Sequence, residues 1–185
     1  MGLFGWLKPR SNKGAVRAWR DRWTRAVETL DADALASLDA ALRQQPPLAD
    51  DVEMEEEMLD GLRHLLDLER ELAAARLPAV DTTHRVVGPD RSQFSAPVSL
   101  PDDPAQPTGR LLLTSARAVF AGGARTPAMP WSGVRDIVQT GRDVIFVSTR
   151  GEGEGQRFRC NSFAEALCGA AIARYLVRQA RSGRL

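Results

Sequence analysis

Apolar residues in the first quarter of the chain recur every three or four positions, which is the spacing of one face of an α-helix. Between Gly14 and Leu30 the residues with this spacing are Val16, Trp19, Trp23, Ala26, Val27 and Leu30. Asp31 and Asp33 then offer a helix N-cap for a further helical turn that carries Leu35, Leu38 and Leu42. Two prolines, Pro46 and Pro47, end this turn.

A second long apolar stripe predicts a helix from about Asp50 to Arg76. Asp50 and Glu53 have the spacing of a capping box, and the glutamates that follow suit the positive end of the helix dipole. The stripe consists of Met58, Leu59, Leu62, Leu65, Leu66 and Leu72. We therefore predict a helical hairpin over residues 14–77, with its loop near 45–49. Its Trp19/Trp23 face is expected to pack on the Leu59/Leu62/Leu66 face.

After Pro78 the helical spacing stops and short β-rich runs begin, most of them separated by glycine or proline. The predicted strands are 82–87, 93–100, 110–114, 116–121, 126–131, 134–139, 143–149 and 156–160. Short strands at this spacing favour an antiparallel sandwich or barrel. A final helix over 162–181 begins at Ser162, which has capping-box spacing to Glu165. The fold class is therefore α+β, with a tail over 1–13, the hairpin over 14–77 and a β unit with its helix over 78–185.

Composition and charge fit a globular protein rather than a disordered one. The chain has 185 residues, of which 43% are hydrophobic and 26% charged. Residues 1–30 carry seven Lys/Arg against two acidic residues, 31–75 carry three against thirteen, and 76–185 carry fifteen against nine. Such blocks indicate distinct binding surfaces, or helices that simply carry solvated charge. The strong preference for arginine over lysine is typical of a GC-rich bacterial genome.

The other composition features point to a cytoplasmic protein. There is no apolar run of about 18 residues that would span a membrane, and no signal-peptide core. Cys160 and Cys168 form neither a disulfide framework nor a CxxC pair, so a reducing compartment is expected.

A motif in the β region resembles a known family. Residues Gly109–Phe120 match the G-x-L-x-L-T-x-x-R-x-x-F strand-turn-strand of GRAM and bacterial pleckstrin-homology-like (PH-like) domains. Met129–Ile137, with Pro130 and Trp131, is similar to the i-P-W-x-x-I-x-x-I run of those domains, and Asp143–Ser148 is similar to their d-x-i-x-v strand. The resemblance covers about 80–181 and implies an antiparallel PH-like β-barrel capped by the C-terminal helix.

Domains of this family usually bind lipid head groups, peptides or partner proteins and are rarely catalytic, so the resemblance implies a binding module or adaptor with a protein partner. Phosphoinositide-binding members carry clustered basic residues around the first hairpin, where this chain offers only Arg85 and Arg91. Arg117, in the turn of the motif, either holds an anion or satisfies loop carbonyls. Trp131 is either a core or rim aromatic or a residue that stacks on a ligand. These four are the candidate ligand or partner residues.

Other features of the sequence favour structural roles. The glycine-rich 151–155 has no lysine and precedes a strand, so it indicates a hairpin tip rather than a phosphate loop. Pro101, Pro104 and Pro107 suit either a stiff loop or a polyproline recognition segment. Neither His64 nor His84 has neighbours with metal-ligand spacing. The sequence therefore predicts no enzyme activity, no cofactor and no metal. Dispersed arginines with few aromatic residues also predict no nucleic-acid binding.

The N-terminal tail suggests a second function. Its membrane-anchor candidates are Leu3, Phe4, Trp6, Leu7, Lys8 and Arg10, a mixture of apolar and basic residues that suits an interfacial anchor on an anionic membrane surface. The alternative is a tail that is disordered or folds back on the hairpin. A protein-binding module and a peripheral membrane protein at the inner face of the membrane are thus the two functions to be tested.

Overall fold

The computed structural model of the chain describes residues 13–44, 52–81, 91–122, 127–151 and 155–183. The chain divides into two compact units, Met1–Leu59 and Asp60–Leu185. The strand predicted over 82–87 lies outside the described residues, as do residues 1–12 of the predicted tail.

The first unit contains α1 (Lys13–Thr29), α2 (Ala32–Gln44) and the beginning of α3 (Val52–Ala73). Leu30 adopts a left-handed backbone conformation, with φ 53°, and ends α1. The Asp31 carboxylate then accepts hydrogen bonds from the backbone N–H groups of Asp33 and Ala34 and so caps α2. The helical turn predicted after Asp31 is therefore a helix of 13 residues.

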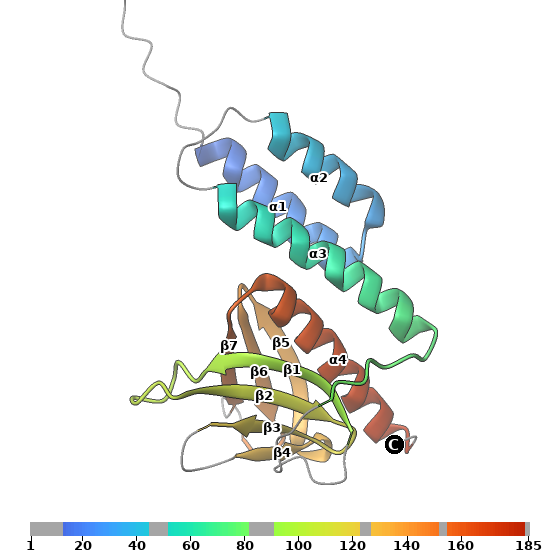
Figure 1. Cartoon of the computed structure of the whole chain (residues 1–185), viewed down its shortest axis with the longest axis vertical. Helices are drawn as coiled ribbons and strands as arrows, with labels where there is room; N and C mark the ends of the chain where they lie inside the picture. Colours follow the sequence, from blue (N-terminus) through green and yellow to red (C-terminus); the bar gives the residue numbers. More distant parts are fainter. Residues whose placement is uncertain (1–12, 45–51, 82–90, 123–126, 152–154, 184–185) are drawn as a thin grey trace, which may run out of the picture. The chain divides into compact units, whose positions relative to one another are not determined.

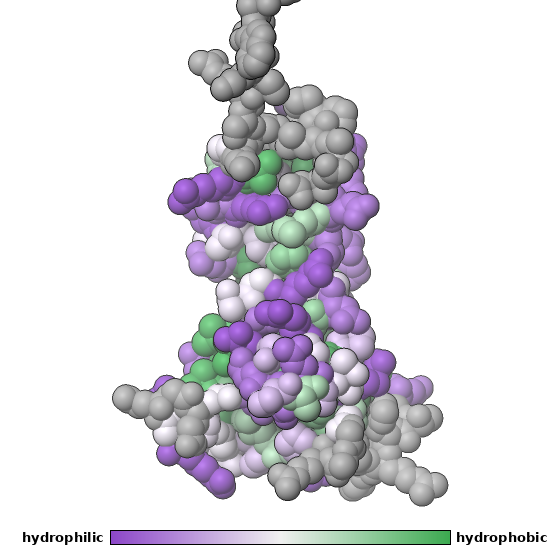
Figure 2. Space-filling model, turned by 90° about the vertical axis from the view of Figure 1, so that its left-hand side faces the viewer, coloured by the Kyte–Doolittle hydropathy of each residue, from purple (hydrophilic) through white to green (hydrophobic). Residues whose placement is uncertain are grey.

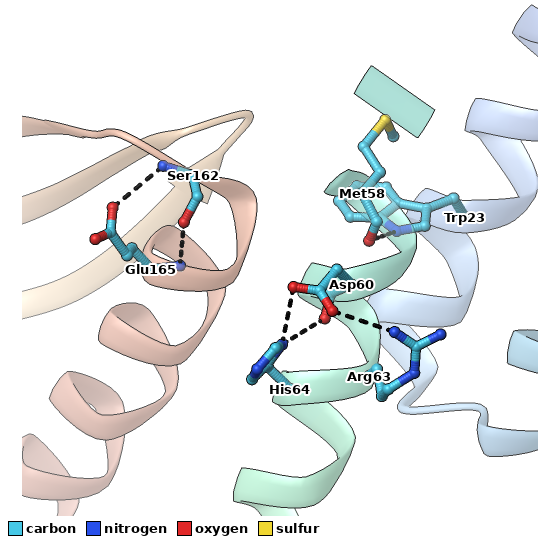
Figure 3. Close-up of polar contacts among 7 residues, drawn as sticks. All are labelled: Trp23, Met58, Asp60, Arg63, His64, Ser162 and Glu165. Carbon is cyan, nitrogen blue, oxygen red and sulfur yellow. Dashed lines mark hydrogen bonds and ion pairs between the residues drawn. The ribbon is translucent and has the colours of Figure 1, made fainter. Parts of the chain in front are cut away.

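Two tryptophans hold the first unit together. Trp19 and Trp23 of α1 are buried, and each satisfies its indole N–H on a backbone carbonyl. Trp19 donates to Leu38 of α2 at 3.0 Å, and Trp23 donates to Met58 of α3 at 2.7 Å (Figure 3). The predicted apolar face of 14–30 is thus the packed face, except that Leu30 at its end is 41% exposed.

The second unit contains a seven-stranded antiparallel sheet. Its strands are β1 (Ser92–Ser99), β2 (Thr108–Thr114), β3 (Arg117–Ala121), β4 (Ala128–Pro130), β5 (Val134–Thr140), β6 (Asp143–Ser148) and β7 (Gly155–Cys160). They lie in the order β4-β3-β2-β1-β7-β6-β5. Figure 1 shows β1–β4 crossing steeply over β5–β7, so the sheet folds over on itself around one core.

The sheet does not close, which corrects the predicted barrel. β4 and β5 are the two ends of the strand order and are not hydrogen-bonded to each other. The chain between them forms a 3₁₀ turn, Trp131–Gly133. β4 has only three residues and ends at Pro130, which lacks the N–H that a further strand partner would need.

The C-terminal helix α4 (Phe163–Arg181) covers the core of this unit. Ser162 and Glu165 form the predicted capping box (Figure 3), in which each side chain accepts from the backbone N–H of the other residue. Buried residues of α4 then pack with apolar residues of the sheet; they include Ala166, Ala170, Ile172, Ala173, Leu176 and Val177. The antiparallel sheet and the helix that covers it are confirmed.

The second half of α3 belongs to this unit and packs on the start of α4. A side chain at Gly61 would meet Phe163 Cβ at 3.1 Å and Leu167 Cδ1 at 3.2 Å, so the two helices touch through a glycine. Leu68 also packs against the sheet core. The apolar stripe predicted for this helix is buried, with Leu62 fully inaccessible to solvent.

Candidate functional site

The motif over 109–120 stabilises the hairpin formed by β2 and β3. Gly109 and Gly122 face each other at the ends of β2 and β3, where a Cβ on Gly109 would lie 2.6 Å from the Ala121 carbonyl oxygen. The Phe120 ring lies equally close to both glycines, 2.8 Å from a Cβ at either position. The first and last residues of the motif therefore serve close packing of a hairpin.

Trp131 lies in the core and is only 2% exposed. Its indole N–H donates to the Thr114 carbonyl at 3.0 Å, and its ring stacks on Phe146 with centroids 6.3 Å apart. The Thr114 hydroxyl in turn accepts the backbone N–H groups of Ala116 and Arg117 and so fixes the motif's turn. Of the two roles left open for Trp131, the structure gives it the one in the core.

The other sequence candidates do not converge on one site in the described structure. Arg117 is half-buried at the start of β3, and Arg91 is exposed just before β1. Arg85 lies outside the described residues, as do the anchor candidates at positions 3–10. Loop 101–107 is a hydrogen-bonded connection between β1 and β2 rather than an extended polyproline segment, because Gln106 donates to Asp103 and Leu100 donates to Pro107.

The sequence candidates did not include the outer face of strands β5, β6 and β7. Ile137, Val144, Phe146 and Phe158 point into the core, so their neighbours in the strands point outward. On that side Val138 pairs with Ile145, and Val147 lies opposite Asp136 and Gly155. Val138 is 41% exposed, and Ile145 and Val147 are partly exposed. We call these three residues the β5–β7 face.

The other half of the sheet shows what a covered outer face looks like. Leu112 of β2 and Val119 of β3 also point away from the core and pair with each other, but they are 0% and 1% exposed. Apolar residues on the outside of β2 and β3 are therefore packed, whereas Val138 on β5 is open to solvent. Figure 2 shows green hydrophobic surface next to purple hydrophilic surface.

Charged residues border the β5–β7 face on the β7 side. Arg157 is the cross-strand neighbour of Ile145, and Arg159 is that of Asp143. Asp143, which is largely buried, accepts two hydrogen bonds from Arg159 at 2.8 and 3.1 Å and lies 3.8 Å from Arg157. Bonding to Asp143 raises the pKa of Arg159. The alternation of Arg157, Phe158 and Arg159 along β7 is a local signal for outward arginines, but their carboxylate partner is on another strand.

A separate open hollow of about 690 Å³ lies where α1 turns into α2. Arg22, Arg25, Asp31 and Asp33 are among the residues that line it. The Asp31 carboxylate already caps α2, and Arg22 donates to Ser37 at 2.7 Å. Basic and acidic side chains both line this hollow, so its net charge does not favour an anionic or a cationic ligand.

Reactive or metal-binding groups do not gather in the part of the chain that the structure describes. Burial raises the pKa of both Cys160 and Cys168 from 9.0 to about 12, so neither sulfur is a thiolate at neutral pH. His64 bonds back to Asp60 of its own helix, with 2.8 Å from Nδ1 to the Asp60 carbonyl (Figure 3). No described residues form a group of three or more potential metal ligands, and no described helix is long and apolar enough to cross a membrane.

Comparisons with known proteins give no family. No family model matches the chain, and no curated protein matches it. Among solved structures, the inner membrane complex sub-compartment protein 1 from Toxoplasma gondii has 12% identity and a TM-score of 0.42, over 73% of this chain and 98% of that one. The complex of the FERM and C-terminal domains of Drosophila Merlin has 13% identity and a TM-score of 0.38, over 79% of this chain and 48% of that one. Values this low carry no inference about a ligand or partner.

Proposed function

We propose that this chain is a non-catalytic, cytoplasmic binding module with a PH-like fold, which docks on a protein partner through the β5–β7 face. The observation that carries the proposal is the exposure of Val138 next to Ile145 and Val147 on the outside of a well-packed sheet. Adjacent exposed apolar residues with a polar rim are typical of protein interaction sites. The raised thiol pKa of both cysteines fits a role without cysteine nucleophiles.

The test compares two equally exposed apolar residues, one in each unit. Val138 on the sheet and Leu30 at the end of α1 are both 41% exposed, so Val138→Asp and Leu30→Asp make the same chemical change. Asp tolerates the left-handed backbone of Leu30. Immobilised wild-type chain, each variant and a blank are exposed to lysate of the source cells, and stoichiometric captured protein is measured.

We expect Val138→Asp to lose a protein that both the wild type and Leu30→Asp retain. If only Leu30→Asp loses the captured protein, the docking site lies on the helical unit and the proposed role of the sheet is wrong. If the wild type and both variants capture the same amount of protein, neither Val138 nor Leu30 lies in the docking site. Both variants are first checked for an unchanged melting temperature, since surface substitutions usually change stability by less than about 0.5 kcal/mol.

The sequence of the tail supports a second candidate function, peripheral membrane binding. Phe4 and Trp6, next to Lys8 and Arg10, have the composition of an interfacial anchor. Basic residues near an anionic leaflet contribute roughly 1 kcal/mol each, so this binding would be weak and salt-sensitive. The measurement is flotation with anionic vesicles at low and high salt. No binding at low salt, or binding that survives Phe4→Ala with Trp6→Ala, excludes the anchor.

A further inference from the structure

The open edge of β5 is covered by arginine side chains of α4. Arg174 donates from Nε to the Ile137 carbonyl at 3.1 Å. Arg181 donates from Nη2 to the carbonyls of Val134 and Arg135, at 3.2 and 2.7 Å. Because β5 ends the strand order, these carbonyls are not needed by another strand. A guanidinium has five N–H donors, so both side chains keep donors that are not used by β5.

These bonds do not pair the arginines with a carboxylate, and Asp136, the exposed acidic residue that follows Arg135 on β5, accepts the backbone N–H of Ile137 instead. A carbonyl is neutral, and within the described residues neither Arg174 nor Arg181 has a carboxylate partner. Arg178 lies between them at helical spacing, on the same face of α4, and is exposed without a described carboxylate partner; the same holds for Arg135 on β5. We call these four residues the α4–β5 arginine cluster. By contrast, Arg157 and Arg159 share Asp143.

Structural roles explain only part of this cluster. The negative end of the α4 dipole favours cations, and covering a strand edge explains Arg174 and Arg181. Neither the helix dipole nor the covering of the β5 edge explains Arg135. Arg178 donates to no described carbonyl and so does not help to cover that edge. The two arginines that bond β5 are also fixed in place, so a ligand that binds them immobilises fewer side chains.

We infer that the α4–β5 arginine cluster binds an Asp/Glu-rich segment of the protein partner. This inference rests on the proposed function, because the cluster and the β5–β7 face share strand β5, where Val138 follows Arg135 by three residues. Arginine pairs with carboxylates in bidentate geometry, which gives the match of charge and shape. A membrane fits this surface less well, because no described Trp or Phe is among the exposed large apolar residues that would insert at an interface.

The experiment uses the full chain and the two arginines that carry no described side-chain bond. Arg135→Glu with Arg178→Glu reverses charge in the cluster and leaves the β5 bonds of Arg174 and Arg181 in place. The matched control, Arg17→Glu with Arg150→Glu, makes the same change in net charge at two other exposed positions. The probe is a fluorescent peptide of alternating Glu and Val, with a Gln/Val peptide as its neutral counterpart, and binding is followed by anisotropy from low to high salt.

We expect the cluster variant to lose at least about tenfold in affinity for the Glu/Val peptide, which is about 1.4 kcal/mol, and the control to stay within about twofold. Wild-type affinity should fall as salt rises, and the Gln/Val peptide should not bind. No binding of the Glu/Val peptide at low salt, or equal loss in both double variants, overturns the inference.

Two further measurements separate other occupants of the cluster. Flotation with vesicles containing phosphatidylserine that depends on Arg135 and Arg178, without peptide binding, assigns the cluster to lipid and overturns the inference. Dimerisation at low salt that the cluster variant abolishes assigns it to a second copy of this chain and overturns it too. If Val138→Asp loses the captured protein while the cluster variant keeps it, the proposed function stands and the inference fails.

Discussion

Trp131 shows how one buried side chain can hold a turn, a strand and a core together. Its indole N–H satisfies the Thr114 carbonyl, and its ring stacks on Phe146. Both partners come from other strands, so the sequence around Trp131 contains neither of them. The Pro130-Trp131 pair before β5 therefore indicates a packing role only once the positions of Thr114 and Phe146 are known.

We expect Trp131→Phe to lower the free energy of unfolding by about 1–3 kcal/mol, because the Thr114 carbonyl would then be buried without its donor. The measurement is urea denaturation followed by circular dichroism. Thr149→Ala is the control, since that exposed hydroxyl lies 3.4 Å from its acceptor and its loss should cost less than about 0.5 kcal/mol. Equal values for both variants would show that the indole hydrogen bond contributes nothing.

At the scale of elements, helix α3 combines a buried apolar stripe with an acidic exposed surface. Leu62 is fully buried, whereas Glu56 is exposed. Leu62→Asp should destabilise the chain by about 3–5 kcal/mol, because it buries a charge with no partner. Glu56→Gln should leave the melting temperature unchanged. A melting temperature that Leu62→Asp does not lower would mean that this face of the helix opens to solvent.

The elements themselves were largely predictable, but their closure was not. Strand β2, predicted over 110–114, runs from Thr108, and the predicted 143–149 is β6 at 143–148. Alternation and glycine spacing are local signals, so they locate strands well. The open seam depends on which strands pair, and the bond from Arg174 to Ile137 joins residues 37 positions apart. No local pattern contains that information, so the sequence, which favoured a sandwich or barrel, indicated neither the open seam nor the α4 arginines that bond β5.

The β5–β7 face was missed for a related reason. Val138 is a valine in a β-strand, as are the core valines of the same sheet, so its residue type does not show that it is exposed. An outward valine can be buried, as Val119 is, or exposed to solvent, as Val138 is. The candidates that sequence did single out, Arg117 and Trp131, were marked by their motif. That motif proved to hold a turn together.

For the whole molecule, the two cysteines couple stability to high pH. Burial raises the pKa of Cys160 and Cys168 to about 12 in the folded chain, while an unfolded thiol titrates near 9.0. Above about pH 9 the unfolded chain therefore releases protons that the folded chain keeps, and the free energy of unfolding falls as pH rises from about 9 to about 12. This contribution is fully present below pH 9.

The check is urea denaturation at pH 8, 9 and 10 for the wild type and for Cys160→Val with Cys168→Ala, which removes the thiol contribution to the pH dependence. We expect a smaller decrease with pH in the double variant. Iodoacetamide should alkylate the native chain slowly at pH 8 and rapidly in urea. Fast alkylation of the folded chain would contradict the raised thiol pKa.

The covering of β5 by α4 has a consequence for self-assembly. Two side chains, rather than another strand, occupy the free carbonyls of this edge. Arg174→Ala with Arg181→Ala would leave the core residues of α4 in place and present these carbonyls to a strand of another chain, and an unprotected strand edge is a template for intermolecular β-addition. We therefore expect the two arginines to hinder strand pairing between molecules, so that their removal increases polymerisation along β5, measured by light scattering.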